Sequence, residues 1–239
     1  MKNLLSQLNP KSLKLIQSIG VLAQSLGMKA YLVGGPVRDL LMGFPNVDLD
    51  ITVQGPGIRL AEAFAAQQAG SQVTRYRAFK TATVHLADGS LIDFATCRKE
   101  VYVKPGAYPV VESSNIMDDL CRRDFTINAM AVAINPETWG QLIDPFKGKA
   151  DVKAKRLRIL HDQSFLDDPT RILRAARFKA RFGLSLEAKT LQWLKSAVKI
   201  KVLDSITAQR YLKDFNKIKK EPKSEEAIKC LKSWDAYKE

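Results

Sequence analysis

The sequence has few of the residues that build disulfide frameworks and zinc sites. Its 239 residues include only three cysteines and two histidines. Cys97, Cys121 and Cys230 are odd in number, far apart and in no zinc-ligand spacing, which argues against a disulfide-rich secreted scaffold and suits a reduced cytosol. His85 and His161 have no partner at ligand spacing. We therefore expect a cytoplasmic protein in which neither histidine binds metal.

Long apolar runs are also missing. No apolar stretch is long enough to span a membrane, and the sequence shows no signal peptide. The sequence shows no internal repeat and no low-complexity segment. We expect no membrane partner, and a chain of this length can bury a sizeable core as one large domain or two small ones.

Acidic residues are scarce, and the shortage is uneven. The chain carries 38 Lys and Arg against 25 Asp and Glu, a formal net charge of +13. Residues 1–146 hold 14 basic against 13 acidic residues, whereas residues 147–239 hold 24 against 12. This split predicts a catalytic unit, 1–146, joined to a polyanion-binding unit, 147–239. A solvated lysine-rich surface is the alternative.

The stretch 31–53, YLVGGPVRDLLMGFPNVDLDITV, carries the clearest chemistry. A short apolar strand leads into Gly34 and Gly35, a sharp turn that begins a helix and offers backbone N–H groups to a phosphate. Asp48 and Asp50 alternate along a second strand, so both project from one face. Two such carboxylates form half of a divalent-metal site. The stretch predicts metal-assisted chemistry on a nucleoside triphosphate.

These residues resemble the signature of the class II tRNA nucleotidyltransferase and bacterial poly(A) polymerase family, GG-x-VRD-x-LLG followed by D-x-D. The resemblance implies an α+β fold, in which a head with a mixed β-sheet and flanking helices precedes an all-helical neck. It implies addition of C and/or A to the tRNA 3′ end from CTP and ATP, with release of pyrophosphate. The basic neck, 147–239, would select the base and bind RNA.

A third carboxylate is expected on the strand Leu91–Phe94. In the family an acidic residue on this strand completes the metal site, and Asp93 is the matching position. The alternative is an ordinary aspartate at a strand end. Asp48, Asp50 and Asp93 would then be the catalytic residues and hold Mg²⁺, which prefers oxygen ligands and phosphates.

The run RRDFTINA, residues 122–129, matches a second motif of the family. Paired guanidiniums can clamp a triphosphate. Asp124 would read the ribose hydroxyl, or alternatively cap a helix that opens at Phe125. The residues expected to hold phosphates are Gly34, Gly35, Arg38, Arg122 and Arg123, and Asn128 belongs to the same nucleotide-binding set.

The run LDDPTRILRAARF, residues 166–178, resembles the family's E-D-x-x-R element and the helix after it, with Asp167 where Glu is usual. Asp168 can accept from the exocyclic amine of C or A, and Arg171 can donate to the ring nitrogen beside it. Arg174 and Arg177 follow on the same helix and complete the nucleotide-binding set. Alternatively, Asp168 is only the helix cap.

Two weaker elements remain. Residues 98–116 are expected to form a long loop, which in the family helps the last nucleotide to be added, although a mere connector is the alternative. Asp144 and Gly148 fit the family's D-x-x-x-G hinge. Family members continue into further helical domains, so we expect either a very short member or a shortened chain. A poly(A) polymerase and a catalytically inactive RNA-binding relative stay open as alternatives.

Overall fold

The computed structural model describes residues 3–45 and 48–238, which divide into two compact units. Unit 1 is made of Met1–Lys99, Val111–Arg123 and Ile127–Lys149, and unit 2 of Glu100–Val110, Asp124–Thr126 and Ala150–Glu239. Two segments that precede residue 147 therefore belong to unit 2. The functions predicted for residues 1–146 and 147–239 stay predictions.

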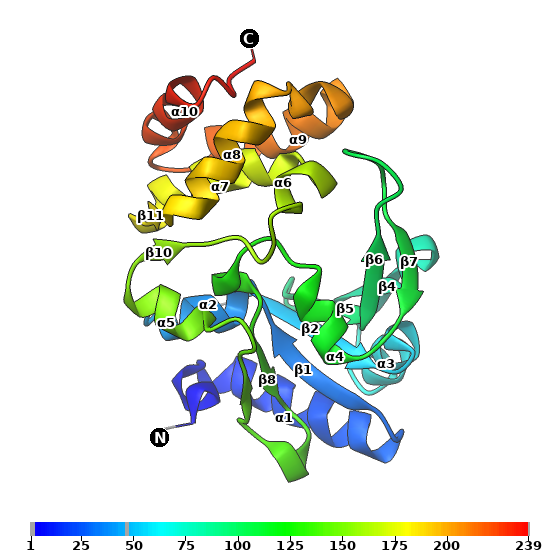
Figure 1. Ribbon diagram of the computed structural model, residues 1–239. Coiled ribbons are helices and arrows are strands. Elements are labelled where there is room, and N and C mark those ends of the chain that lie inside the picture. The colour runs from blue at the N-terminus through cyan, green and yellow to red at the C-terminus, as the bar shows by residue number, and fades with distance from the viewer. Residues whose placement is uncertain (1–2, 46–47, 239) are drawn as a thin grey trace. The chain divides into compact units, whose positions relative to one another are not determined.

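Unit 1 is built on a mixed sheet (Figure 1). Its strands lie in the order β3 (Gln72–Tyr76), β4 (Thr81–His85), β5 (Leu91–Thr96), β2 (Leu49–Gln54), β1 (Lys29–Val33), β8 (Ala131–Ala133) and β9 (Leu142–Ile143). β2 and β5 are parallel, whereas β1 pairs antiparallel with both β2 and β8. The mixed sheet predicted for this part of the chain is confirmed.

Helices pack on this sheet through apolar stripes. α1 (Pro10–Ser25) begins at Asn9, whose side chain accepts from the Ser12 N–H, and it buries Ile16 and Ile19 against β1. α3 (Gly57–Ala66) packs on β4 and β5, where the Phe64 and Phe94 rings lie 6.0 Å apart. In both helices the buried apolar residues recur at helical spacing.

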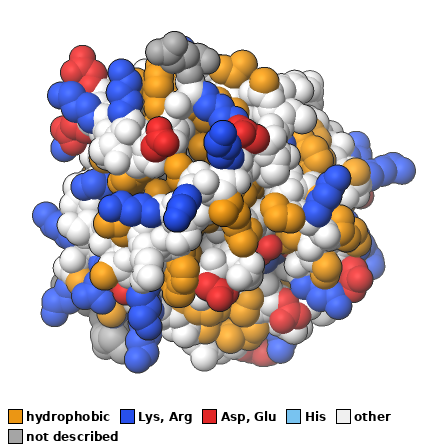
Figure 2. Space-filling model, turned by 45° about the horizontal axis from the view of Figure 1, so that its top comes forward, with side chains coloured by type: hydrophobic (Ala, Val, Ile, Leu, Met, Phe, Trp, Pro, Cys, Tyr) orange, Lys and Arg blue, Asp and Glu red, His pale blue; other side chains and the backbone are white. Residues whose placement is uncertain are grey.

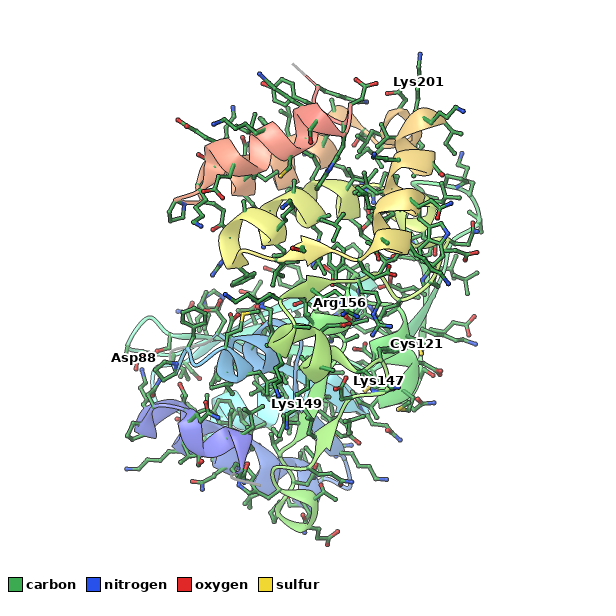
Figure 3. The ribbon with its side chains drawn as sticks, turned by 60° about the vertical axis from the view of Figure 1, so that its left-hand side comes forward. Asp88, Cys121, Lys147, Lys149, Arg156 and Lys201 are labelled. Atoms are coloured by element: carbon green, nitrogen blue, oxygen red, sulfur yellow. The ribbon has the colours of Figure 1, made fainter. Side chains whose placement is uncertain are left out.

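The turn between β4 and β5 contains Asp88, which accepts from the Ser90 N–H at 2.9 Å (Figure 3). This is the turn expected from its Asp and Gly residues. Cys121, at the end of α4 (Ile116–Cys121), is exposed, and all three cysteines are free thiols. No disulfide therefore stabilises the described part of the chain.

The prediction of a long irregular loop at 98–116 is wrong in part. The chain there forms two paired strands, β6 (Arg98–Val101) and β7 (Val110–Ser113), before α4 begins. Both prolines lie between the strands, where no ladder bond is lost, and valines occupy the strands themselves. The two prolines and the glycine lie only between the strands, so they do not make the whole of residues 98–116 irregular.

Unit 2 is mainly helical, with α6 (Ser164–Asp167), α7 (Thr170–Phe182), α8 (Ala188–Lys199), α9 (Ala208–Lys219) and α10 (Ser224–Ser233). α7 packs against α9 and α10 (Figure 1). The expectation of an all-helical part is wrong in one respect, since β10 (Arg156–Leu157) and β11 (Ser185–Leu186) pair in parallel. That pairing joins the segment before α6 to the segment that follows α7.

Across residues 3–45 and 48–238, no helix is long and apolar enough to cross a membrane. On the face drawn in Figure 2, Lys and Arg side chains are spread among hydrophobic and acidic ones. The excess of basic residues is therefore dispersed on this face and does not form a single block.

Candidate active site

The turn at Gly34 is built to bring the start of α2 (Gly35–Leu41) against an arginine. Gly34 has φ +74°, and a Cβ there would lie 2.5 Å from Nη1 of Arg123. Its N–H donates to the Met130 carbonyl at 3.0 Å. The backbone conformation therefore requires glycine, which explains the first residue of the predicted Gly34–Gly35 turn, and a larger residue would also displace the end of the Arg123 side chain.

Arg38 and Asn128 are held inside unit 1. Arg38 is 6% exposed, and its Nη1 donates to Asn128 Oδ1 at 2.6 Å. Its Nε donates to Asp39 Oδ1 at 2.8 Å. These bonds hold the Arg38 guanidinium close to the glycine turn, where a Cβ at Gly35 would lie 3.5 Å from Nη2. The predicted nucleotide contacts of Arg38 and Asn128 stay predictions.

The parallel pairing of β2 and β5 places Asp50 directly beside Asp93. Thr83, on β4, donates to Asp93 Oδ1 at 2.5 Å. Asp50 is partly buried. Its pKa is raised to about 6, mainly by burial and secondly by the negative charge of Asp93, while the positive charge of Arg123 lowers it. Two carboxylates repel each other at this face, and a cation would relieve the repulsion.

Asp48 is exposed and directly precedes β2. The strand predicted from Val47 therefore begins at Leu49, and Val47 itself lies outside the described residues. Within residues 3–45 and 48–238, no three His, Cys, Asp or Glu side chains are gathered closely enough to hold a metal. The side-by-side oxygens of Asp50 and Asp93 nevertheless suit a hard divalent cation, and the part of Asp48 as a third ligand stays a prediction.

Arg122 and Arg123 share one buried acid. Arg122 Nη2 lies 2.8 Å from Asp119 Oδ1, and Arg123 Nη2 lies 2.8 Å from Asp119 Oδ2. Asp119 is fully buried; burial alone would raise its pKa, but Arg123 and Arg122 hold the pKa below its usual value. Each guanidinium keeps about a sixth of its side chain exposed, so Asp119 fixes the pair while leaving a positive surface.

A cleft of about 400 Å³ collects these groups in unit 1. It is lined by Asp50, Asp93, Arg122 and Arg123, with Thr83 and Tyr76 at its side. Carboxylates suited to a cation therefore face the same space as guanidiniums suited to phosphate oxygens. The cleft has the charge pattern needed for a metal–triphosphate complex.

Asp124 lies in unit 2, although it directly follows Arg123 in the sequence. It is 5% exposed, its Oδ1 accepts from the Phe125 N–H at 2.7 Å, and its Oδ2 lies 2.5 Å from Arg174 Nη2. The helix expected at Phe125 is instead a short 3-10 turn, η3 (Thr126–Asn128). The ribose contact of Asp124 stays a prediction.

The start of α7 carries the residues predicted to read the base. Asp168 Oδ1 accepts from the Thr170 N–H at 3.2 Å and from Thr170 Oγ1 at 2.7 Å, so it does cap the helix. Arg171 is 4% exposed, and its Nη1 donates to Ser164 Oγ at 2.6 Å. α7 ends at Gly183, as the sequence predicted.

Arg174 and Arg177 follow on α7 and lie over an aromatic ring. The Arg177 guanidinium carbon is 4.9 Å from the centre of the Phe178 ring, and that of Arg174 is 5.8 Å away. Arg177 Nε also lies 3.5 Å from Glu221 Oε1. These arginines belong to the packing of unit 2, and their contact with a nucleotide stays a prediction.

The predicted residues thus fall into two groups. Unit 1 holds Gly34, Gly35, Arg38, Asp48, Asp50, Asp93, Arg122, Arg123 and Asn128, and unit 2 holds Asp124, Asp168, Arg171, Arg174 and Arg177. Asp144 accepts from the Gly148 N–H at 2.6 Å at the start of α5 (Gly148–Lys153). That bond explains the spacing of the D-x-x-x-G element, and its role as a hinge stays a prediction.

Two buried acids were missed from the sequence. Asp119 precedes Arg122 and Arg123 by three and four residues, a helical spacing that could have found it. Asp151 is 3% exposed and accepts from Thr126 Oγ1 at 2.6 Å and from Arg158 Nε at 2.9 Å. It holds the segment after Asp124 in unit 2, and no local pattern marks it.

Comparison with known proteins identifies the family to which the chain belongs. The family described as "Poly A polymerase head domain" matches residues 30–158, more than half of the chain. An A-adding tRNA nucleotidyltransferase of Halalkalibacterium halodurans is 46% identical over 178 residues, which are 74% of this chain and 42% of that protein.

Solved structures are similar as well. "The structure of CCA-adding enzyme apo form II" has a TM-score of 0.92 at 41% identity and covers 98% of this chain and 55% of that one. "Thermotoga maritima CCA-adding enzyme complexed with tRNA_CCA" has a TM-score of 0.86 at 39% identity, covering 98% and 53%. The chain spans about half the length of these relatives.

Proposed function

The chain belongs to the poly(A) polymerase head domain family, and from this premise we propose that it transfers nucleotides from ATP, CTP or both to the 3′-hydroxyl of a tRNA. The products would be a tRNA lengthened by C or A and pyrophosphate. The relatives' names, A-adding and CCA-adding, support this substrate class and leave the choice between A alone and complete CCA to experiment.

One observation carries the proposal. Asp50 and Asp93 are paired across β2 and β5 in a cleft that Arg122 and Arg123 also line. Transfer of a nucleotidyl group needs positioning of the triphosphate and stabilisation of the charge that develops on it. The arginine pair, fixed by Asp119, would bind the phosphate oxygens and lower the cost of pyrophosphate departure.

The expected cofactor is a divalent cation, and Mg²⁺ is proposed because the donors are all carboxylate oxygens. Asp50 and Asp93 would hold it, with Asp48 as the third acid. A bound divalent ion supplies charge stabilisation at the reacting phosphate and acidity at the attacking hydroxyl. The pairing of Asp50 with Asp93 across β2 and β5 supports the assignment, because a bound cation would offset the repulsion between the two carboxylates.

Base selection is proposed for unit 2. Asp168 would accept from the exocyclic amine of cytosine or adenine, and Arg171 would donate to the adjacent ring nitrogen. Uracil and guanine present the reverse order of donors and acceptors at these positions. Asp124 would contact the ribose, and Arg174 with Arg177 would complete the nucleotide pocket.

RNA binding is proposed for the basic residues 147–239, which would contact the phosphates of the acceptor end. A tRNA-processing role and three free thiols fit a cytoplasmic enzyme. Gly34, Gly35 and Arg38 would complete the triphosphate site of unit 1, with Asn128 as a neighbour of Arg38.

The decisive experiment is end sequencing of a tRNA transcript that lacks CCA, after incubation with Mg²⁺ and ATP, CTP or both. We expect C, A or CCA at the 3′ end and no extension when the metal is chelated. Long A tails on any RNA would instead identify a poly(A) polymerase. Absence of incorporation at any RNA end, with RNA binding retained, would favour a catalytically inactive relative.

A further inference from the structure

Arg210, on α9, joins three parts of unit 2. We define the tip segment as residues 102–109, which connect β6 to β7. Arg210 Nη1 donates to the carbonyl of Gly106 in the tip segment. Its Nη2 lies 3.1 Å from Asp168 Oδ1, and its guanidinium carbon is 4.8 Å from the centre of the Tyr108 ring. One guanidinium therefore contacts both the tip segment and the acid predicted to read the base.

The tip segment is seated closely enough for this contact to matter. The Gly106 N–H donates to the carbonyl of Leu166, just before Asp168, at 3.1 Å. Gly106 has φ +69°, and a Cβ there would collide with Ser205. Both the backbone conformation and the lack of space require glycine at 106. The tip segment is thus held against Leu166 and Ser205 as well as against Arg210.

A second contact brings the tip segment to the same region. The Tyr102 hydroxyl donates to Glu100 Oε2 at 2.8 Å. Burial and the nearby charge of Glu100 raise the pKa of Tyr102, while Arg171 acts in the opposite direction. The charge of Arg171 therefore reaches Tyr102, at the start of the tip segment.

The hydrogen bonds of Asp168 are unequal between its two oxygens. Oδ1 accepts from the Thr170 N–H, from Thr170 Oγ1 and from Arg210. In the part of the chain that the structure describes, no donor is bonded to Oδ2. Three donors on one oxygen fix the orientation of the carboxylate and leave Oδ2 to accept from a ligand.

We propose that Arg210 is a positioning residue for base choice, which orients Asp168 with Oδ2 toward the nucleotide and clamps the tip segment to the same carboxylate. The inference rests on the function proposed above and assigns it a further residue. Arginine suits the role because its planar group can stack on Tyr108 while donating in two directions. Lysine keeps the charge but cannot make all three contacts.

The test compares Arg210→Gln, Arg210→Lys and the matched control Lys213→Gln, which removes one exposed positive charge from the same helix. The measurement is kcat/KM for each of the four triphosphates with a tRNA transcript. Arg210→Gln should lower discrimination against UTP and GTP by about 5- to 20-fold, less than the loss of a whole charge-assisted hydrogen bond, because Arg210 acts on the base only through Asp168. Arg210→Lys should recover part of it.

Lys213→Gln should leave base selectivity unchanged. If the wild-type enzyme is active and the base selectivity of Arg210→Gln lies within twofold of that of Lys213→Gln, the inference about Arg210 is overturned and the proposed function is not. A wild type that incorporates no nucleotide would contradict the proposed function. The rise in melting temperature on adding CTP or UTP would then compare base choice without turnover. If the ratio of the CTP shift to the UTP shift is the same in wild type and in Arg210→Gln, the inference is overturned.

Amide hydrogen exchange tests the clamp without any nucleotide. Peptides that cover residues 102–109 should exchange faster in Arg210→Gln and in Tyr108→Ala than in Lys213→Gln, at equal thermal stability. Tyr108→Ala removes the stacking partner and keeps the Arg210–Asp168 bond, so it separates the two contacts. Unchanged exchange in both variants would overturn the clamp.

Discussion

In both units arginines are held by ion pairs with acidic residues, but the acids come from nearby in the sequence in unit 1 and from distant positions in unit 2. In unit 1, Asp119 fixes Arg122 and Arg123 from one helical turn earlier. In unit 2, the arginines of α7 are held by acids from distant parts of the chain, Asp124 for Arg174 and Glu221 for Arg177. The first arrangement is local, and the second exists only when the unit is folded.

The difference has a consequence for function. A local clamp keeps the arginine pair of unit 1 together with little dependence on the rest of the fold, which suits residues that must meet a highly charged triphosphate. A tertiary clamp makes the arginines of α7 depend on how unit 2 packs.

The largest effect is expected at the carboxylates of unit 1. Asp50→Asn should lower nucleotide incorporation by about a thousandfold or more, because it removes a proposed metal ligand. It should not lower the thermal stability, since it relieves repulsion with Asp93 at a partly buried position. Activity is measured by single-nucleotide incorporation, and stability by thermal denaturation.

Asp88→Asn is the control for that change, as it neutralises a carboxylate in the turn between β4 and β5, away from the cleft. It should keep activity within about twofold, as expected of a surface position. Activity of Asp50→Asn within a few-fold of wild type would remove the metal assignment.

The local clamp is tested by Asp119→Ala. Loss of the buried partner of two arginines should lower the free energy of unfolding by about 2–3 kcal/mol, less than a fully buried pair because both guanidiniums reach solvent. Incorporation should also fall, with a raised KM for triphosphate. Urea denaturation and steady-state kinetics measure the two effects.

Glu112→Gln is the matched control for the clamp, because it breaks the exposed ion pair with Lys99 in the same unit. It should change stability by less than about 0.5 kcal/mol. If Asp119→Ala were as mild as this control, the arginine pair would not depend on Asp119.

The glycine turn is tested by Gly34→Ala against Gly43→Ala. Both residues have positive φ, but a Cβ at Gly43 meets nothing within 4 Å, whereas one at Gly34 meets Arg123. Gly43→Ala should cost only the backbone strain, about 1 kcal/mol. Gly34→Ala should cost more and lower incorporation about tenfold or more, because Arg123 must move.

Thermal denaturation and incorporation assays on both variants measure this difference. Equal loss of activity in the two variants would show that the strain matters and that the approach to Arg123 does not.

In unit 2, the expected effect is on selectivity more than on rate. Asp168→Asn keeps an oxygen that can cap Thr170, but the amide can present a donor where a base amine needs an acceptor. Preference for CTP and ATP over UTP and GTP should fall about tenfold. The four triphosphates are compared in single-nucleotide incorporation, and unchanged selectivity would leave Asp168 only its capping role.

The smallest effect is expected from the basic surface. Charge reversal at Lys195 and Lys199, both exposed on α8, should weaken RNA binding. The slope of log affinity against log salt concentration should fall by the amount expected for the loss of about two phosphate contacts. Reversal of exposed Lys14 and Lys29 in unit 1 is the control and should matter less. Binding is measured by titration at several salt concentrations, and equal losses in the two pairs would contradict RNA binding by residues 147–239.

Local patterns gave the sequence-based predictions their success. The glycine turn and the alternation around Asp50 each depend on a few adjacent residues, and both appear in the structure. The hairpin of β6 and β7 was missed because prolines at its tip concealed the strands. Its pairing depends on a partner strand that no local window contains.

The order of the amino acids sets which charged residues the protein carries and how far apart they lie along the chain, including the two carboxylates and the adjacent arginines. Folding is needed to bring Asp50 beside Asp93, to pair Asp124 with Arg174 and to bring Arg210 to Asp168. The physical reason is that spacing along a helix or strand follows from backbone geometry alone. Contacts between distant segments follow from which buried surfaces and charges pair once the whole unit has packed.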